Sequence, residues 1–135
     1  MELCLSHITL IVKDLTRTGK LFKELFEAEE VYSSGDAAFS LSREKFFLIG
    51  KLWFCIMEGE PLPEQTYNHI AFSVPNEALE QYEQKIRKLG LTIRPGRPRV
   101  SGEGQSLYFY DYDNHLFELH AGSLTQRLTR YAQVK

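Results

Sequence analysis

The sequence predicts an α+β protein in which a βαβββ module occurs twice and the strands form a mixed or largely antiparallel sheet with helices on one face. The first observation is a repeat, because residues 6–12 read Ser-His-Ile-Thr-Leu-Ile-Val and residues 68–74 read Asn-His-Ile-Ala-Phe-Ser-Val. The second is that each copy alternates like a strand and is followed by apolar residues at helical spacing. The third is that short strand-like stretches follow each helix.

Two longer helices and one short helix are expected. The first begins near Asp14 or Thr16, which are both suitable N-cap residues, and the second begins after Pro75 with Asn76 as its N-cap and ends at Gly90. A short helix capped by Ser123 is predicted at about residues 123–132. The apolar stripes of the two longer helices are Leu21, Phe22, Leu25 and Phe26, and Leu79, Tyr82, Ile86 and Leu89.

Strands complete each module. In the first half they are expected over residues 38–41, 46–49 and 52–57, and in the second half over residues 91–93, 106–110 and 116–120. The segment 94–104, rich in proline and glycine, is expected to be a loop. We therefore predict a single domain over residues 1–135, with module one at about 1–60, module two at about 64–122, and the C-terminal helix at about 123–132.

Composition excludes several classes of function. With 43% hydrophobic and 25% charged residues the 135-residue chain is typical of a globular domain, and its net charge of −2 does not suit a nucleic-acid partner. An anionic substrate would therefore need specific arginines. The two cysteines form no CxxC pair, the N-terminus carries no basic leader, and no segment has the roughly 20 apolar residues of a membrane span. These features favour a cytoplasmic protein.

Three polar residues lie in predicted strands at positions that the packing of an apolar core does not explain. Alternation places His7 and His69 on the sides of their strands that face away from the helices, at equivalent positions of the repeat. Glu118 lies in the middle of an apolar strand, where burying a carboxylate is costly unless it is paired or ligated. Taken singly, such residues are usually solvated surface groups. Together, two imidazoles and one carboxylate are typical of a half-open metal site that accepts Mn, Fe, Co, Ni or Zn. His120 is an alternative third ligand or a partner of Glu118.

The chain closely resembles the vicinal-oxygen-chelate superfamily and, within it, the hydrolase branch of the fosfomycin-resistance proteins. The resemblance covers nearly the whole chain, and it implies that the two βαβββ modules form a cupped mixed sheet. It is carried by the segments LSHITLIVKDL (5–15), YSSGDAAFSLSREKFFLIG (32–50), LWFCIMEG (52–59), TYNHIAFSV (66–74) and RPRVSGEGQSLYFYDYDNHLFELHAG (97–122).

This resemblance implies a metal-dependent hydrolase that adds water to the epoxide of fosfomycin. It implies His7, His69 and Glu118 as ligands of one divalent ion, Mn²⁺ above all, and Glu44 as the general base. Without it, Glu44 between Arg43 and Lys45 reads as surface charge. The residues that it places at the substrate are Thr9 beside the epoxide and Ser106, Tyr108 and Arg127 at the phosphonate. It also implies a homodimer in which each site takes one histidine from one chain and the other two ligands from its partner.

Departures from relatives leave alternatives open. Thiol-transferring relatives hold the phosphonate with a lysine that Pro98 replaces here, which leaves Arg94, Arg97 and Arg99 as candidates for that role. Relatives that use bacillithiol have a cysteine at the position of Thr9. Neither form of thiol transfer is supported by these residues, and a thiol transferase acting on fosfomycin is the nearest alternative of the same architecture. A metal-free protein that binds and sequesters the drug is an alternative of another class.

Overall fold

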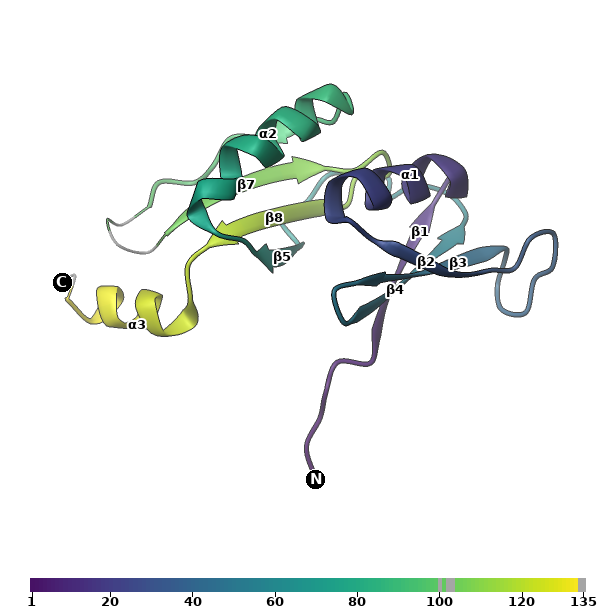
Figure 1. The fold of residues 1–135 in the computed structure, drawn as a ribbon, viewed down its shortest axis with the longest axis horizontal. Helices are drawn as coiled ribbons and strands as arrows, with labels where there is room; N and C mark the ends of the chain where they lie inside the picture. Colours follow the sequence, from purple (N-terminus) through teal and green to yellow (C-terminus); the bar gives the residue numbers. More distant parts are fainter. Residues whose placement is uncertain (100, 102–103, 134–135) are drawn as a thin grey trace. The chain divides into compact units, whose positions relative to one another are not determined.

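The computed structural model of the chain describes residues 1–99, 101 and 104–133. They form two compact units, Met1–Pro63 and Glu64–Lys135. Each unit contains a four-stranded mixed sheet with a long helix packed on one face, and the two sheets have equivalent strand orders (Figure 1). The predicted α+β class and the repeated βαβββ order are confirmed.

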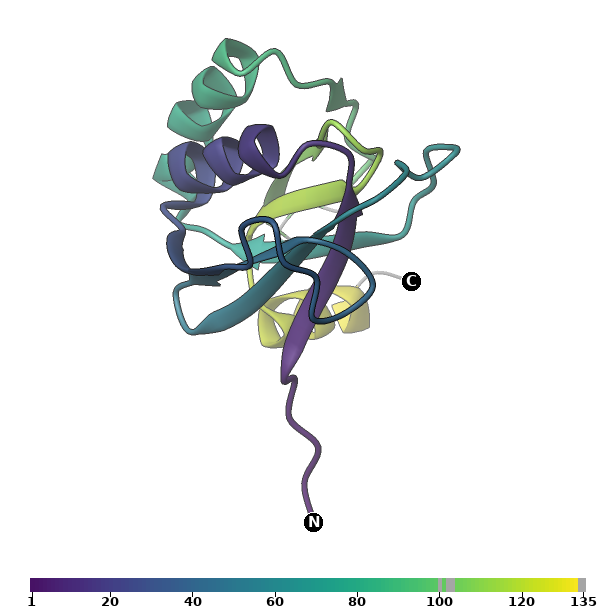
Figure 2. The same cartoon turned by 90° about the vertical axis from the view of Figure 1, so that its right-hand side faces the viewer.

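The first unit has its strands in the order β1-β4-β3-β2, with β1 parallel to β4 and the other neighbours antiparallel. Residues before β1 are exposed and run away from the sheet (Figure 2). The elements are β1 (His7–Val12), α1 (Leu15–Phe26), β2 (Glu29–Ser33), β3 (Glu44–Ile49) and β4 (Leu52–Glu58).

Helix α1 is fixed at its start by Asp14, whose carboxylate accepts a hydrogen bond from the Arg17 backbone N–H, as predicted for an N-cap. Its apolar stripe lies on the sheet through Phe22, whose ring meets Phe47 and Phe54 edge-on at centroid distances of 5.5 and 5.9 Å. These side chains are completely buried and form the core of the unit.

One predicted strand is wrong. Residues 38–41 lie in a loop, where Phe39 and Leu41 are 81% and 88% exposed. The edge beside β3 is instead occupied by β2, which begins only two residues after the end of α1. This pairing places Glu30 within 3.0 Å of Lys45. A short apolar stretch forms a strand only where a sheet edge is available, and β2 has already taken that edge.

The second unit repeats the pattern in the order β5-β8-β7-β6, with β5 parallel to β8. Stacked rings of Phe72, Phe117 and Phe109 build its core. The elements are β5 (His69–Ser73), the 3₁₀ turn η1 (Asn76–Ala78), α2 (Leu79–Lys88), β6 (Ile93–Arg94), β7 (Gln105–Tyr110), β8 (Leu116–Ala121) and α3 (Leu124–Gln133).

Helix ends in this unit agree with the sequence in part. Asn76 was expected to cap the long helix, but it is the first residue of η1, so α2 begins three residues later without a side-chain cap. Gly90 follows α2 with a positive φ of 73°, as expected at a helix end. Ser123 caps α3 through a 3.0 Å bond from the Gln126 N–H to its hydroxyl oxygen.

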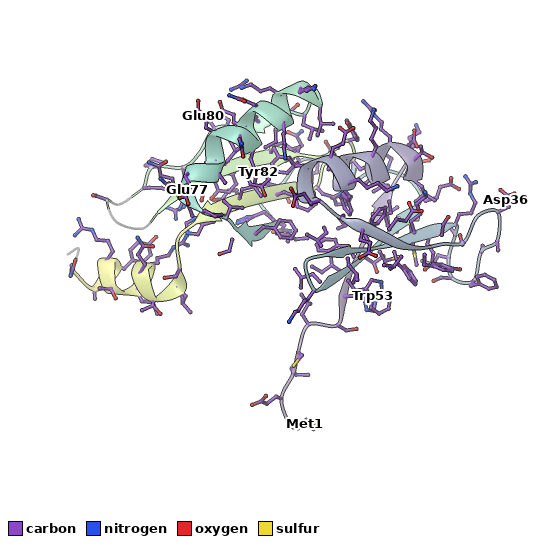
Figure 3. All side chains as sticks on the ribbon, in the orientation of Figure 1. Met1, Asp36, Trp53, Glu77, Glu80 and Tyr82 are labelled. Carbon is purple, nitrogen blue, oxygen red and sulfur yellow. The ribbon has the colours of Figure 1, made fainter. Side chains whose placement is uncertain are left out.

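The sheet face opposite each helix carries the polar residues of interest. In β1 the side chains of Leu10 and Val12 are buried, whereas His7 and Thr9 on the other face are exposed. Trp53 of β4 lies beside His7 in the strand register, and Figure 3 shows its side chain on the side of the sheet away from α1. Among the helices of residues 1–99, 101 and 104–133, none is long and apolar enough to cross a bilayer.

Candidate active site

Two of the predicted ligands meet on the open face of the second sheet. His69 and Glu118 lie on the parallel neighbours β5 and β8, and His69 Nε2 is 3.0 Å from Glu118 Oε1. His69 Nδ1 is 2.7 Å from the carbonyl oxygen of Tyr67. Since a carbonyl only accepts hydrogen bonds, Nδ1 carries the proton. The Nε2 lone pair of a neutral ring therefore points at a carboxylate oxygen.

Two acceptors this close repel each other unless a cation or a proton lies between them. An imidazole whose second nitrogen donates to a backbone carbonyl has the orientation typical of a metal ligand. Because both groups are ordinary ligands of divalent ions, the donor set of His69 and Glu118 fits a metal ion.

The other oxygen of Glu118 is held by protein donors. Oε2 accepts a hydrogen bond from the Ser106 hydroxyl and lies 3.2 Å from Arg99 Nη2. Burial alone would raise the pKa of this carboxyl, but the hydrogen bond from Ser106 and the positive charge of Arg99 act against that effect, and the pKa lies below its ordinary value. Glu118 is thus an anion at neutral pH, with Oε1 turned toward His69.

A second chain of contacts continues from Ser106. Its Oγ lies 2.6 Å from His120 Nδ1, and His120 Nε2 lies 3.2 Å from Nη2 of Arg127 on α3. Arg127 is thereby connected to Glu118 through His120 and Ser106. Ser106 and Arg127 are both predicted phosphonate contacts.

Tyr108 is buried at the same face. Its hydroxyl oxygen accepts hydrogen bonds from Arg99 Nη2 at 2.8 Å and from the Tyr67 hydroxyl at 3.1 Å, which directs its own proton elsewhere. Burial, followed by the negative charge of Glu118, raises the pKa of Tyr108 to about 12, so it stays protonated as a donor. Sequence reasoning did not single out Tyr67, although it shares strand parity with His69.

The three candidate arginines now differ in their surroundings. Arg99 is the one beside Glu118 and Tyr108, with a side chain that is 14% exposed. Arg94 donates to Tyr110 and its guanidinium lies over the ring of Tyr67, 5.2 Å from the centroid. Arg97 contacts the hydroxyl of Tyr131.

The remaining predicted residues belong to the first unit. His7 packs against Trp53, with ring centroids 4.1 Å apart and the ring planes tilted by 31°. On the same face, Thr9 is paired in register with Cys55, whose Sγ donates to Glu44 Oε1 at 3.8 Å. Burial, followed by the negative charge of Glu44, raises the pKa of the Cys55 thiol to about 11, so it remains a neutral donor.

Glu44 is not the surface charge that its neighbours in sequence suggest. The residue is only 6% exposed, at the start of β3. Its side chain is thus enclosed on the sheet face that also carries His7 and Thr9.

Within residues 1–99, 101 and 104–133, no three His, Cys, Asp or Glu side chains form a group that could hold a metal ion. The structure brings His69 and Glu118 together in the unit of residues 64–135, whereas His7, Thr9 and Glu44 share one sheet face in the unit of residues 1–63.

Comparison with known proteins identifies relatives over nearly the whole chain. Residues 5–119 match the model of the Glyoxalase/Bleomycin resistance protein/Dioxygenase superfamily. The chain is 65% identical over 127 residues to the fosfomycin resistance protein FosX of Listeria monocytogenes, covering 94% of this chain and 96% of that protein. It is 32% identical over 135 residues to the metallothiol transferase FosB of Bacillus licheniformis, covering 97% and 83%.

Solved structures give the same result. A mutant of Listeria monocytogenes FosX in complex with Mn(II) and 1S,2S-dihydroxypropylphosphonic acid superimposes with a TM-score of 0.89 at 59% identity, covering 97% of this chain and 99% of that one. FosX of Mesorhizobium loti superimposes with a TM-score of 0.86 at 53% identity, covering 96% and 100%.

Proposed function

The chain belongs to the Glyoxalase/Bleomycin resistance protein/Dioxygenase superfamily and, within it, to the FosX fosfomycin resistance proteins, and from this membership we propose that it adds water to the epoxide of fosfomycin. The observation that carries the proposal is the dihydroxypropylphosphonic acid bound with Mn(II) by the Listeria relative. That compound is the vicinal diol that results when water opens the epoxide of a propylphosphonate. The relative that is 65% identical is a fosfomycin resistance protein, so we propose resistance to fosfomycin as the biological function.

His7, His69 and Glu118 are the proposed ligands of one divalent ion, Mn²⁺ by analogy with the relative. The fixed tautomer of His69 and the anionic state of Glu118 support this assignment. When bound, such an ion supplies a Lewis acid for the oxygen that leaves carbon as the ring opens.

The proposed site is shared between two chains of a homodimer. His7 belongs to one compact unit, and His69 and Glu118 belong to the other. We assign the face bearing His7, Thr9 and Glu44 to one chain and the His69–Glu118 pair to its partner, as in a closed twofold assembly.

Glu44 is the proposed general base. The thiol of Cys55 holds Oε1, and we assign Oε2 to the attacking water. The carboxylate takes a proton from water as the water oxygen bonds to an epoxide carbon. The carbon–oxygen bond of the ring breaks, its electron pair stays on the departing oxygen, and protonation of that oxygen completes the diol.

The anion-binding side of the site is supplied by Tyr108, Arg127 and Arg99. Ser106 was expected at the phosphonate as well, but its hydroxyl proton is donated to Glu118, so we assign it to holding that ligand. Tyr108 already accepts two hydrogen bonds, so its own proton is directed to a phosphonate oxygen. Among the three candidate arginines, Arg99 is proposed to replace the phosphonate-binding lysine of the thiol-transferring relatives. Its guanidinium donates to the Tyr108 hydroxyl and to Glu118, and a planar guanidinium suits a phosphonate well. Thr9 lies on the face of Glu44 and is proposed to contact the epoxide. We place the protein in the cytoplasm, where the exposed thiol of Cys4 stays reduced.

Phosphorus NMR of fosfomycin incubated with the protein and Mn²⁺, without any thiol, tests the proposal. The expected result is conversion to the diol phosphonate, abolished by a chelator. Turnover only when glutathione or bacillithiol is added, giving a thioether, would make the protein a thiol transferase. Stoichiometric binding without turnover would make it a drug-sequestering protein.

A further inference from the structure

His120 lies two residues after Glu118 on β8 and is not a proposed ligand or substrate contact. Its side chain is 13% exposed and lies between Ser106 and Arg127. Both ring nitrogens are already engaged, Nδ1 with Ser106 and Nε2 with Arg127. A third-ligand role for His120 would require breaking one of these contacts, which argues against that alternative.

The direction of every hydrogen bond in this chain follows from the carboxylate at its end. Glu118 Oε2 only accepts, so the single hydroxyl proton of Ser106 points at it. Ser106 Oγ must then accept from His120, which places the imidazole proton on Nδ1. Nε2 is left with a lone pair, and it accepts from Arg127 Nη2. The donors thus run in one direction, from Arg127 through His120 and Ser106 to Glu118.

We propose that His120 is a positioning residue that sets both the metal ligand and the anion-binding arginine through its two ring nitrogens. This inference rests on the proposed function. On one side, the Nδ1 proton makes Ser106 a donor to Oε2, so that Oε1 stays turned toward His69 Nε2. On the other side, Nε2 accepts a hydrogen bond from the guanidinium of Arg127, a residue of α3.

The contact of Nδ1 with Ser106 and the contact of Nε2 with Arg127 can be removed one at a time by amide side chains of different length. The amide nitrogen of an asparagine reaches about where Nδ1 lies, and the amide oxygen of a glutamine reaches about where Nε2 lies. His120→Asn therefore keeps the donor to Ser106 and loses the acceptor for Arg127. His120→Gln keeps the acceptor for Arg127 and loses the donor to Ser106, and His120→Ala loses both.

The experiment measures two dissociation constants for each variant in the full-length protein. The first is that of Mn²⁺ alone, followed by the electron paramagnetic resonance signal of free Mn²⁺. The second is that of methylphosphonate, titrated calorimetrically into the Mn²⁺-saturated protein. Outer partners of metal ligands are worth roughly 10- to 100-fold in metal affinity, and a hydrogen bond to a charged group is worth about tenfold or more in anion affinity.

We expect the asparagine and glutamine variants to affect different dissociation constants. His120→Gln weakens Mn²⁺ binding about 10-fold or more and leaves methylphosphonate binding within about threefold of wild type. His120→Asn does the reverse, and His120→Ala weakens both. Each variant is thus the control for the folding of the other.

The proposal is overturned if the asparagine and glutamine variants change both constants in parallel, if neither constant changes in any variant, or if the wild type does not bind Mn²⁺. Hydrolysis by the wild-type protein is measured separately. It decides the proposed function regardless of the variants, so the failure of one idea is distinguishable from the failure of the other.

Discussion

Replacing Glu44 with glutamine removes the proposed base while leaving its surroundings almost unchanged. The backbone of residue 44 is held by Ser34, through a 2.9 Å bond to its N–H and a 3.0 Å bond to its carbonyl oxygen, and neither bond uses the carboxylate. The amide oxygen of glutamine can still accept from Cys55 Sγ. We therefore expect the fold to survive, with an unfolding temperature close to that of the wild type.

The effect on the reaction should be large. A positioned general base is worth roughly 10²–10⁴-fold in rate, equivalent to about 2.7–5.5 kcal/mol of transition-state free energy. Since neither the proposed metal ligands nor the phosphonate contacts include Glu44, Mn²⁺ affinity should be unchanged. The loss should fall on kcat with KM little altered, because the proton transfer occurs only in the transition state.

The assay is the initial rate of diol formation by phosphorus NMR, with Mn²⁺ affinity and circular dichroism measured on the same preparations. Glu58→Gln is the matched control, since it removes an exposed glutamate of the neighbouring strand whose partner is Arg43. The control should hydrolyse fosfomycin at nearly the wild-type rate. If Glu44→Gln also stays within a few-fold of wild type, water is activated by another group and the assignment of the base fails.

Other changes test the metal site and the thiols. His69→Ala and Glu118→Ala should each weaken Mn²⁺ binding at least about tenfold while circular dichroism is unchanged; retention of full affinity would remove that residue from the ligand set. Inactive His7→Ala and Glu118→Ala chains refolded together should regain about a quarter of wild-type activity, because about half the dimers are mixed and each has one intact site; verified mixed dimers without activity would place all three ligands on one chain. The Cys55 pKa of about 11 leaves only about one thiolate in a thousand at pH 8, so mass spectrometry should find iodoacetamide on Cys4 alone until the protein is unfolded; rapid labelling of native Cys55 would contradict this.

The sequence predicted those features that depend on periodicity. Alternation in a strand is a local property, so the outward faces of His7 and His69 followed from the repeat, and the structure agrees with both. Helix α1 and its cap at Asp14 followed from local spacing and from the preference of N-caps for short polar side chains.

Features that depend on which strands are neighbours in a sheet could not be predicted from the sequence. Residues 38–41 have strand-like composition, but β2 occupies the edge of β3. Glu44 is flanked by charges in the sequence and is buried because the register of β3 on β4 sets it near Cys55. Arg99 lies in an irregular segment, and only its contacts with Tyr108 and Glu118 distinguish it from Arg94 and Arg97.

The central claim is that water, deprotonated by Glu44, opens the epoxide directly. A single turnover in ¹⁸O-labelled water, with enzyme in excess over fosfomycin and the diol analysed by mass spectrometry, tests it. Direct attack predicts one ¹⁸O atom in the diol from the first turnover and none in the protein. An unlabelled diol from the first turnover would contradict the claim, because the new oxygen would then have come from the protein, with a carboxylate such as that of Glu44 attacking as a nucleophile.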